Sequence, residues 1–212
     1  MEKLAIFDID YTITKKETLM EFFKYMIFKD IKNIIYIPRA IYCGVMFCIK
    51  KYDEKKVKET FLKFIESKNK EELSKITKDF YESVLKNILY NDALDMMKKL
   101  KSEGYLIYLI SASPEFYVKE FLTIEEVDEV IGTRFQFENE IFNRKMEGNN
   151  CKGEEKVERL KTLLKEKNIK VDYPNSYMFS DSLSDKPLLN LVGNGYLINY
   201  KKKSSFKVLK WK

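Results

Sequence analysis

The sequence of 212 residues contains no histidine, and this absence excludes several kinds of active site. Ser–His–Asp and Cys–His triads, HExxH zinc sites and imidazole general bases all need that side chain. Acid–base chemistry in this chain must therefore come from carboxylates, lysines or tyrosines. With 7 glycines, 4 prolines and 45% hydrophobic residues, the chain is expected to be globular rather than fibrous or disordered.

Cysteines are also few: Cys43, Cys48 and Cys151 are the only ones. They form no CxxC pair, and an odd number in a chain of this size does not indicate a disulfide framework. The first apolar run ends at Asp8, before it reaches the length of a signal-peptide core. We therefore expect reduced thiols and a cytoplasmic protein.

Long apolar runs are scarce, and the longest covers residues 34–49. It is too short for a typical membrane-spanning helix and contains Pro38 and Arg39. We expect this stripe to be buried in the helical part of the protein. A surface that seats a lipid or rests on a membrane is the alternative.

Neither sign of charge dominates, since 39 Lys and Arg stand against 33 Asp and Glu, a net charge of +6. The lysines alternate with acids along the predicted helices, as on a solvated surface, and no aromatic and basic recognition motif accompanies them. We therefore expect no nucleic-acid partner. The basic tail, residues 201–212, is expected to be solvated, with Phe206 and Trp211 docked on the domain.

What is present is an alternation of strand and helix patterns, typical of α/β proteins with a parallel sheet. Residues 3–9 form an apolar, β-branched run that ends in two acids and predicts a buried strand. Further strands are expected at 105–110, 177–179 and 196–198, and helices at 92–103, 154–167 and 186–191, with another helix opening at Pro114.

Two segments interrupt this alternation. From 15 to 88 the apolar residues follow helical spacing, which predicts several helices and no strand. Alternating residues over 130–146, on both sides of Asn139, predict a small hairpin. We expect a core formed by residues 1–14 and 89–212, with 15–88 as a helical cap inserted after the first strand.

Asp8 and Asp10 stand two residues apart directly after the first predicted strand. The carboxyl ends of strands are where α/β sheets place ligands, and a turn there can aim both acids at one ligand. One acid could then act as a nucleophile while the other moves protons. Alone, the pair is a modest signal, because acids after strands also cap turns and helices.

Asp181 and Asp185 follow another predicted strand, 177–179. Mg²⁺ prefers oxygen ligands and keeps several waters, so two carboxylates, a backbone carbonyl and a phosphate oxygen suffice to hold it. The strand-end acids therefore suggest a magnesium site, with the capping of a turn and a short helix as the alternative.

Candidate phosphate ligands lie between the two acidic pairs. Ser111 and Ala112 follow a predicted strand and precede a helix start, where a hydroxyl and backbone N–H groups suit a phosphate. Lys156 lies near the start of the predicted helix 154–167, where a cation opposes the helix dipole and so calls for another explanation. Lys152 is a nearby competitor for the same role.

These groups occur in the order of the four motifs of the haloacid dehalogenase superfamily, which the chain resembles. The motifs are an Asp pair after the first strand, a Ser or Thr after the second, a distant Lys and an acidic pair. Segments 111–114, 153–157 and 180–185 are most similar to subfamily IB, which includes the phosphoserine phosphatase-like enzymes. The resemblance covers nearly the whole core, while the cap matches in position and character more than in residues.

The resemblance implies Mg²⁺-dependent hydrolysis of a phosphate monoester through an aspartyl-phosphate. Asp8 would be the nucleophile, and Asp10 would protonate the leaving oxygen and then activate water. Ser111, the Ala112 backbone and Lys156 would hold the phosphoryl oxygens. The metal ligands would be Asp8, Asp10 through its backbone carbonyl, Asp181 and, unless it orients Lys156 instead, Asp185.

The chain departs from phosphoserine phosphatases at two places. Tyr11 stands where glycine is frequent, and Ala112–Ser113 replaces a Gly–Gly pair. Glu17, by contrast, occupies the position of an acid that reads the substrate amine in that family. Arg39, the only arginine of the predicted cap, could bind a substrate carboxylate, although a surface arginine is the commoner outcome.

We expect the substrate to be a small, soluble phosphate ester, with a phosphoserine-like compound among the candidates. A lipid phosphate similar to phosphatidylglycerophosphate, cleaved at a membrane surface, is the alternative suggested by residues 34–49 and the basic tail. A non-catalytic module that binds phosphate esters is the alternative from another class. The sequence does not indicate an oligomeric state.

Overall fold

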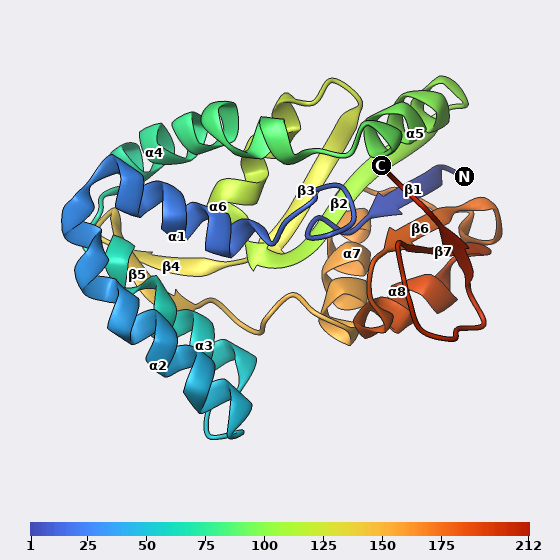
Figure 1. Cartoon of the computed structure of the whole chain (residues 1–212). Helices are drawn as coiled ribbons and strands as arrows, with labels where there is room; N and C mark the ends of the chain where they lie inside the picture. The colour runs from blue at the N-terminus through green and yellow to red at the C-terminus, as the bar shows by residue number, and fades with distance from the viewer.

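The computed structural model describes all residues, 1–212, and is built on a six-stranded sheet (Figure 1). The strand order is β3-β2-β1-β6-β7-β8, and every neighbouring pair is parallel. The strands are β1 (Lys3–Phe7), β2 (Tyr105–Pro114), β3 (Val127–Thr133), β6 (Tyr177–Ser180), β7 (Asn194–Ile198) and β8 (Lys207–Leu209). The predicted α/β class with a Rossmann-like parallel sheet is confirmed.

Side-chain alternation along β1 divides the interior into two cores. Ala5 and Phe7 join a cluster of 38 buried residues, while Leu4 and Ile6 join one of 14. Among the helices, α5 (Asn91–Ser102) packs into the larger core, and α7 (Glu154–Glu166) and α8 (Lys186–Leu191) pack into the smaller one. Because β1 is central and covered on both faces, the residues at its carboxyl end are held firmly.

Between β1 and α5 every named element is helical. The ends of this segment meet where Thr14 pairs with Leu89 in an isolated bridge, and the Tyr90 N–H donates to the Ile13 carbonyl at 2.9 Å. The elements are α1 (Thr18–Lys29), the 3-10 helix η1 (Ile31–Tyr36), α2 (Ile37–Cys48), α3 (Glu54–Phe61), η2 (Leu62–Ile65), α4 (Lys70–Ser83) and η3 (Leu85–Ile88). In Figure 1, α2 and α3 project from the rest of the molecule.

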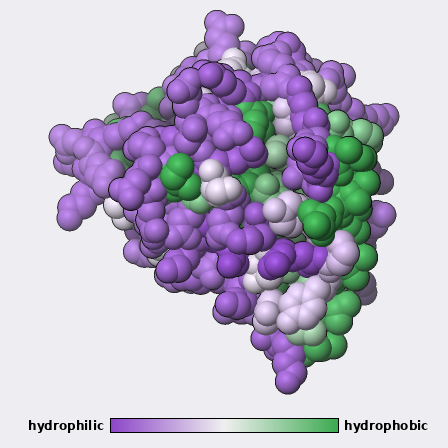
Figure 2. All heavy atoms as spheres, turned by 90° about the vertical axis from the view of Figure 1, so that its left-hand side faces the viewer, coloured by the Kyte–Doolittle hydropathy of each residue, from purple (hydrophilic) through white to green (hydrophobic).

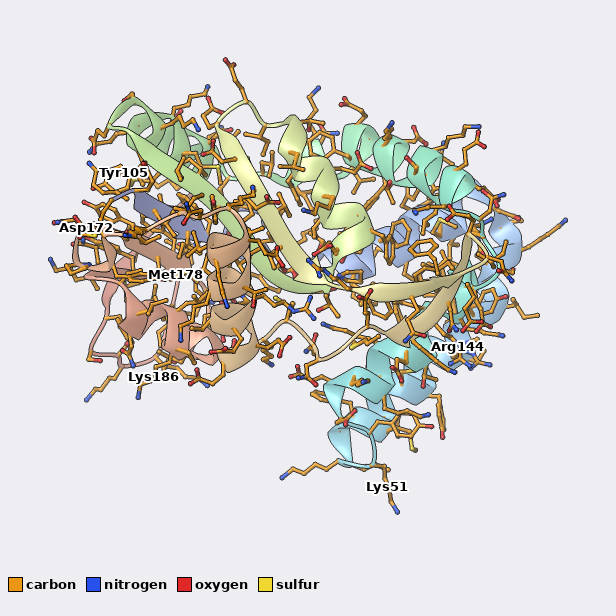
Figure 3. All side chains as sticks on the ribbon, turned by 180° about the vertical axis from the view of Figure 1, so that it is seen from behind. Lys51, Tyr105, Arg144, Asp172, Met178 and Lys186 are labelled. Atoms are coloured by element: carbon orange, nitrogen blue, oxygen red, sulfur yellow. The ribbon has the colours of Figure 1, made fainter.

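A two-stranded hairpin, β4 (Phe135–Glu138) and β5 (Ile141–Met146), leaves the main sheet and reaches the helical segment. Arg144 of β5, labelled in Figure 3, donates to the carboxylate of Glu66 at 2.8 Å and to the carbonyl of Glu59 at 2.9 Å. The expected hairpin began too early, at residue 130. Residues up to Thr133 belong to β3, because they pair with β2.

Three further expectations differ from the structure in extent. Strand β2 continues through Ser111 and Ala112 to Pro114, since its pairing with β3 extends to Thr133. The helix expected from Pro114 is one short turn, α6 (Glu115–Val118), followed by the 3-10 helix η4 (Lys119–Thr123). The tail is not only a solvated end: it adds β8 to the sheet edge before Trp211 docks on the core.

The apolar stripe of residues 34–49 is not buried, contrary to expectation. Ile35 is 75% exposed and Ile41 62%. Figure 2, which views the molecule from the left-hand side of Figure 1, shows apolar side chains gathered along one edge of the surface. The 18 residues Ile31–Cys48 have the length and mean hydropathy of a short membrane span. Only 6% of that stretch is buried in the protein. No other element of the chain covers the outer face of α2.

Candidate active site

The carboxyl ends of β2, β1 and β6 bring the predicted acids together. Asp8 directly follows β1 and is nearly buried, and its N–H donates to the Phe179 carbonyl on β6 at 2.9 Å. Asp181 directly follows β6, and its N–H donates to the Thr12 hydroxyl at 2.8 Å. The loop after β1 is therefore tied to the loop after β6, as neighbouring parallel strands require.

Lys156 lies at the centre of these acids. Its Nζ donates to Asp8 Oδ1 and to Asp185 Oδ2, both at 2.7 Å, and its side chain is 2% exposed. Burial alone would lower the pKa of Lys156, but the two carboxylates raise it above its ordinary value. The competitor Lys152 pairs instead with Glu54 and stays partly exposed. The first turn of α7 therefore carries a buried, charged lysine.

The carboxylates outnumber the cation that they surround. Burial raises the pKa of Asp8 to about 8, with Lys156 opposing the shift and Asp185 adding to it. Burial and the Asp185 charge also raise the pKa of Asp181 to about 6. Asp185 accepts from Lys156 and from the Ser180 hydroxyl, yet its second oxygen, Oδ1, is buried without a partner. The site therefore favours an additional positive charge.

This arrangement fits a magnesium ion. No group of three or more acidic or cysteine side chains is placed to hold a metal by itself. Mg²⁺ does not need such a group, because carbonyl, water and substrate oxygens complete its shell. The raised pKa values of Asp8 and Asp181, together with the unpartnered oxygen of Asp185, match a site that gains from a bound cation.

Asp10 is turned toward a cluster of hydroxyls that sequence reasoning missed. Its Oδ1 accepts from the N–H and the hydroxyl of Thr18, each at 2.7 Å, and its Oδ2 accepts from the Ser113 hydroxyl at 2.6 Å. The Thr18 hydroxyl also lies 3.1 Å from the Tyr117 hydroxyl. Only Ser113, beside the predicted Ser111, carried a signal in the sequence.

The end of β2 presents Ser111 and Ala112 to the same region. Ser111 is fully buried, and its hydroxyl accepts the Ser113 N–H at 3.0 Å. The Ala112 carbonyl accepts from Lys58 Nζ of α3 and from the Thr133 hydroxyl, both at 2.6 Å. Burial lowers the pKa of Lys58 to about 8. Nothing in the sequence distinguishes Lys58 from the other lysines of the helical segment.

The structure brings Glu17 to the site but not Arg39. Glu17 caps α1 by accepting the Met20 N–H at 2.6 Å, and burial with the nearby Asp10 charge raises its pKa to about 7. Arg39 lies exposed on α2, and its side chain makes no hydrogen bond or ion pair. Its predicted contact with a substrate carboxylate has no support from its position.

The chain is similar in sequence to known phosphatases over most of its length. Residues 5–190 match the haloacid dehalogenase-like hydrolase family, and the chain belongs to that family. Phosphoserine phosphatase SerB1 of Mycobacterium tuberculosis H37Rv is 21% identical over 201 residues, which are 92% of this chain and 64% of SerB1. The probable phosphatase Rv3661 of the same organism is 21% identical over 198 residues, 92% of this chain and 68% of that protein.

Solved structures show the same fold. A protein of unknown function from Bordetella pertussis Tohama I gives a TM-score of 0.86 at 20% identity, over 99% of this chain and 98% of that one. A probable phosphoserine phosphatase from Vibrio cholerae gives a TM-score of 0.70 at 12% identity, over 95% of this chain and 57% of that one. At these identities the likeness is one of fold.

Proposed function

We propose that this chain hydrolyses phosphate monoesters, with Asp8 as the nucleophile. The observation that carries the proposal is the pairing of buried Asp8 with Lys156 at 2.7 Å, at the carboxyl end of the central strand. A carboxylate placed there can attack a phosphoryl group bound at the sheet edge and form an aspartyl-phosphate. Water would then hydrolyse this intermediate and regenerate Asp8.

Asp10 would move the protons of both steps. In the first step it donates a proton to the oxygen of the leaving alcohol as the ester bond to phosphorus breaks. In the second it takes a proton from the water that attacks the aspartyl-phosphate. The hydroxyls of Thr18 and Ser113 hold its two oxygens, so that the carboxyl is oriented before substrate arrives.

Lys156 would hold a phosphoryl oxygen and offset the repulsion between the phosphate and Asp8. Its contact with Asp185 keeps the ammonium group charged and in place. Ser111 and the backbone of Ala112 would bind the remaining phosphoryl oxygens. Residues 15–88, which bring Lys58 and Glu17 beside these groups, would act as the cap that chooses the substrate.

Mg²⁺ would be held by the side chains of Asp8 and Asp181 and the backbone carbonyl of Asp10, with Asp185 beside them. When bound, it supplies positive charge that stabilises the phosphoryl oxygens during transfer. A non-catalytic binding module would not need a buried nucleophile beside a second acid, so we favour the enzyme.

The proposal is tested by measuring phosphate release from p-nitrophenyl phosphate and a panel of phosphate monoesters, with and without Mg²⁺. We expect Mg²⁺-dependent turnover that Asp8→Asn abolishes, because an amide is a poor nucleophile and a weaker metal ligand. Lys152→Ala, at the exposed lysine paired with Glu54, serves as the control and should keep wild-type turnover. Full activity in Asp8→Asn would contradict the proposal.

A further inference from the structure

An apolar groove opens between α1, α2 and α3. Its volume is about 920 Å³, at the upper end of the range for small-molecule sites, and 11 of its 15 lining residues are hydrophobic. Its aromatic and aliphatic lining includes Leu19, Phe23, Ile41, Phe47, Val57 and Phe61. The groove therefore suits a hydrocarbon group better than a polar metabolite.

One end of the groove is continuous with the proposed phosphate site. Tyr11, Glu17 and Lys58 line this end of the groove, and the charges of Glu17 and Lys58 interact with that of Asp10. Tyr11 directly follows Asp10, and Lys58 donates to the carbonyl of Ala112. Tyr11 has a φ of +56°, a conformation that glycine adopts more easily, yet the chain keeps a large aromatic side chain there, 49% exposed. A ligand with its phosphate at Asp8 would thus extend past Tyr11 into the groove.

The floor of the groove is packed while its rim is open. Leu19, Phe23 and Phe61 are buried among their neighbours, whereas Ile41 and Phe47 remain exposed. Charged side chains in the lining are confined to Glu17, Glu54 and Lys58, so most of the groove offers nothing to a charged group of a substrate. Covering these exposed apolar side chains with a hydrocarbon lowers the free energy.

We propose that the substrate is a lipid phosphate, a phosphate monoester whose hydrocarbon chain lies in this groove. The inference rests on the proposed function, since it places the phosphate at Asp8 and Lys156. It replaces the expected small, soluble ester, because the groove offers a hydrocarbon-sized apolar surface and Arg39 does not line it.

The outer face of α2 identifies a bilayer as the source of such a substrate. Val45 of α2 is exposed there without a protein partner, as are Ile34 and Ile35 of the preceding η1. Lysines stand at both ends of the helical stretch, as on helices that lie on anionic lipid, and Lys51 marks its projecting tip in Figure 3. These lysines are Lys32, Lys50 and Lys51.

The groove is tested with alkyl phosphates from butyl to dodecyl, each kept below its critical micelle concentration. Burial of one CH₂ group is worth about 0.8 kcal/mol, so kcat/KM should rise up to about fourfold for each CH₂ added within the groove. Hydrolysis of p-nitrophenyl phosphate is measured alongside. Phosphate release from p-nitrophenyl phosphate with no dependence on chain length would overturn the inference and leave the proposed function intact.

The variant Gly44→Glu tests the groove by placing a charged side chain in it. Gly44 lines the groove, and a Cβ added there meets no atom within 4 Å, so a carboxylate can enter without disturbing the helix. The ratio of kcat/KM for dodecyl to butyl phosphate should fall at least tenfold. Thr162→Glu, on the exposed side of α7, is the control and should keep the wild-type ratio. Equal ratios in all three proteins would also overturn the inference.

A binding measurement distinguishes a wrong assignment of the lipid substrate from a wrong assignment of the hydrolytic activity. Calorimetry of the same alkyl phosphates with Asp8→Asn should show affinity that rises with chain length. Such a rise without turnover in the wild type would support the groove and contradict the proposed function. A flat affinity series, or a dimer in sedimentation that Ile41→Glu dissociates, would overturn the lipid inference.

The bilayer is tested with dodecyl phosphate held in vesicles of neutral lipid containing an anionic lipid. The double variant Ile35→Glu, Val45→Glu should lower turnover of vesicle-held substrate relative to monomeric substrate by at least tenfold. An unchanged ratio would show that the chain takes its substrate from water and would contradict the assignment of the bilayer.

Discussion

Asp10 shows how single residues define this site. Its two carboxylate oxygens accept hydrogen bonds from α1 and from the end of β2, so its direction is set by elements far apart in the sequence. The motif pattern predicted Asp10 itself. It could not predict Thr18 or Tyr117, because their contacts exist only once α1 and α6 pack together. The residues proposed to react could be predicted from the sequence, whereas those that position them, Ser113 apart, could not.

Thr18→Val tests this positioning. The change keeps the shape of the side chain but removes the hydroxyl that lies 2.7 Å from Asp10. We expect kcat to fall roughly 10²-fold for alkyl phosphates and less for p-nitrophenyl phosphate, whose leaving group needs no proton. Thr77→Val is the control, because the Thr77 hydroxyl bonds Glu120 at 2.6 Å, away from the acids. Equal losses with both substrates would contradict the positioning role.

Lys156 and Lys152 form a natural pair for comparison. Lys156→Ala removes a buried cation that bonds two carboxylates, and we expect loss of most phosphate affinity and turnover. Lys152→Ala removes an exposed ion pair, which contributes about 0–1 kcal/mol to stability. Steady-state kinetics and inhibition by inorganic phosphate measure both variants. A reversed order of effects would assign the phosphate role to Lys152.

At the scale of elements, the sequence predicted whether a segment is a helix or a strand better than it predicted which neighbouring elements cover that segment. Helical spacing correctly predicted a helix over much of 34–49, but spacing alone cannot show whether another element will cover its apolar face. Strand β2 extends beyond the apolar run that predicted it, because small polar residues at Ser111 and Ser113 continue the strand backbone beside β3. Burial and strand length both depend on neighbouring elements.

Glu129 links three elements and predicts an acid-dependent loss of stability. Burial would raise its pKa, but hydrogen bonds from Lys167 and Lys119 lower it to about 2. A lowered folded-state pKa gives stability that is present above the unfolded value, near 4.5, and lost as the pH falls toward 2. We expect Glu129→Gln to lower the free energy of unfolding by roughly 1–2 kcal/mol at pH 7.

Urea unfolding across this pH range measures the effect. The difference between Glu129→Gln and the wild type should shrink as the pH falls through the window between the two pKa values. Glu125→Gln, at an exposed acid without an ion pair, is the control and should match the wild type. A difference that stays constant down to the lowest pH would contradict the assignment.

At the scale of the whole molecule, the last residues of the chain add the edge strand β8 to the sheet and pack Trp211 on its core. Trp211 is 7% exposed and packs near Phe7 and Phe179, whose strands carry Asp8 and Asp181 at their ends. The sequence predicted the docking of Trp211 but not β8, because Lys207–Leu209 is too short and too charged to read as a strand. The segment becomes a strand because it pairs with β7, although its own residues have little tendency to form one.

Trp211→Ala should therefore weaken the site as well as the fold. Removing a large buried aromatic side chain costs about 3–5 kcal/mol, and the cavity would lie under β1 and β6. We expect a lower unfolding midpoint in urea and reduced turnover, with Trp211→Phe intermediate in both. Unchanged stability in Trp211→Ala would show that the tail does not support the sheet.

The central claim is that Asp8 carries the phosphoryl group, and trapping that intermediate tests it most directly. Asp10→Asn should still allow attack on p-nitrophenyl phosphate but slow hydrolysis of the aspartyl-phosphate, so the intermediate should accumulate. Rapid-quench mass spectrometry should then find one phosphoryl group on the peptide containing Asp8, and none in Asp8→Asn. A phosphorylated Asp10 in the wild type, or turnover with no covalent adduct in any variant, would contradict the account.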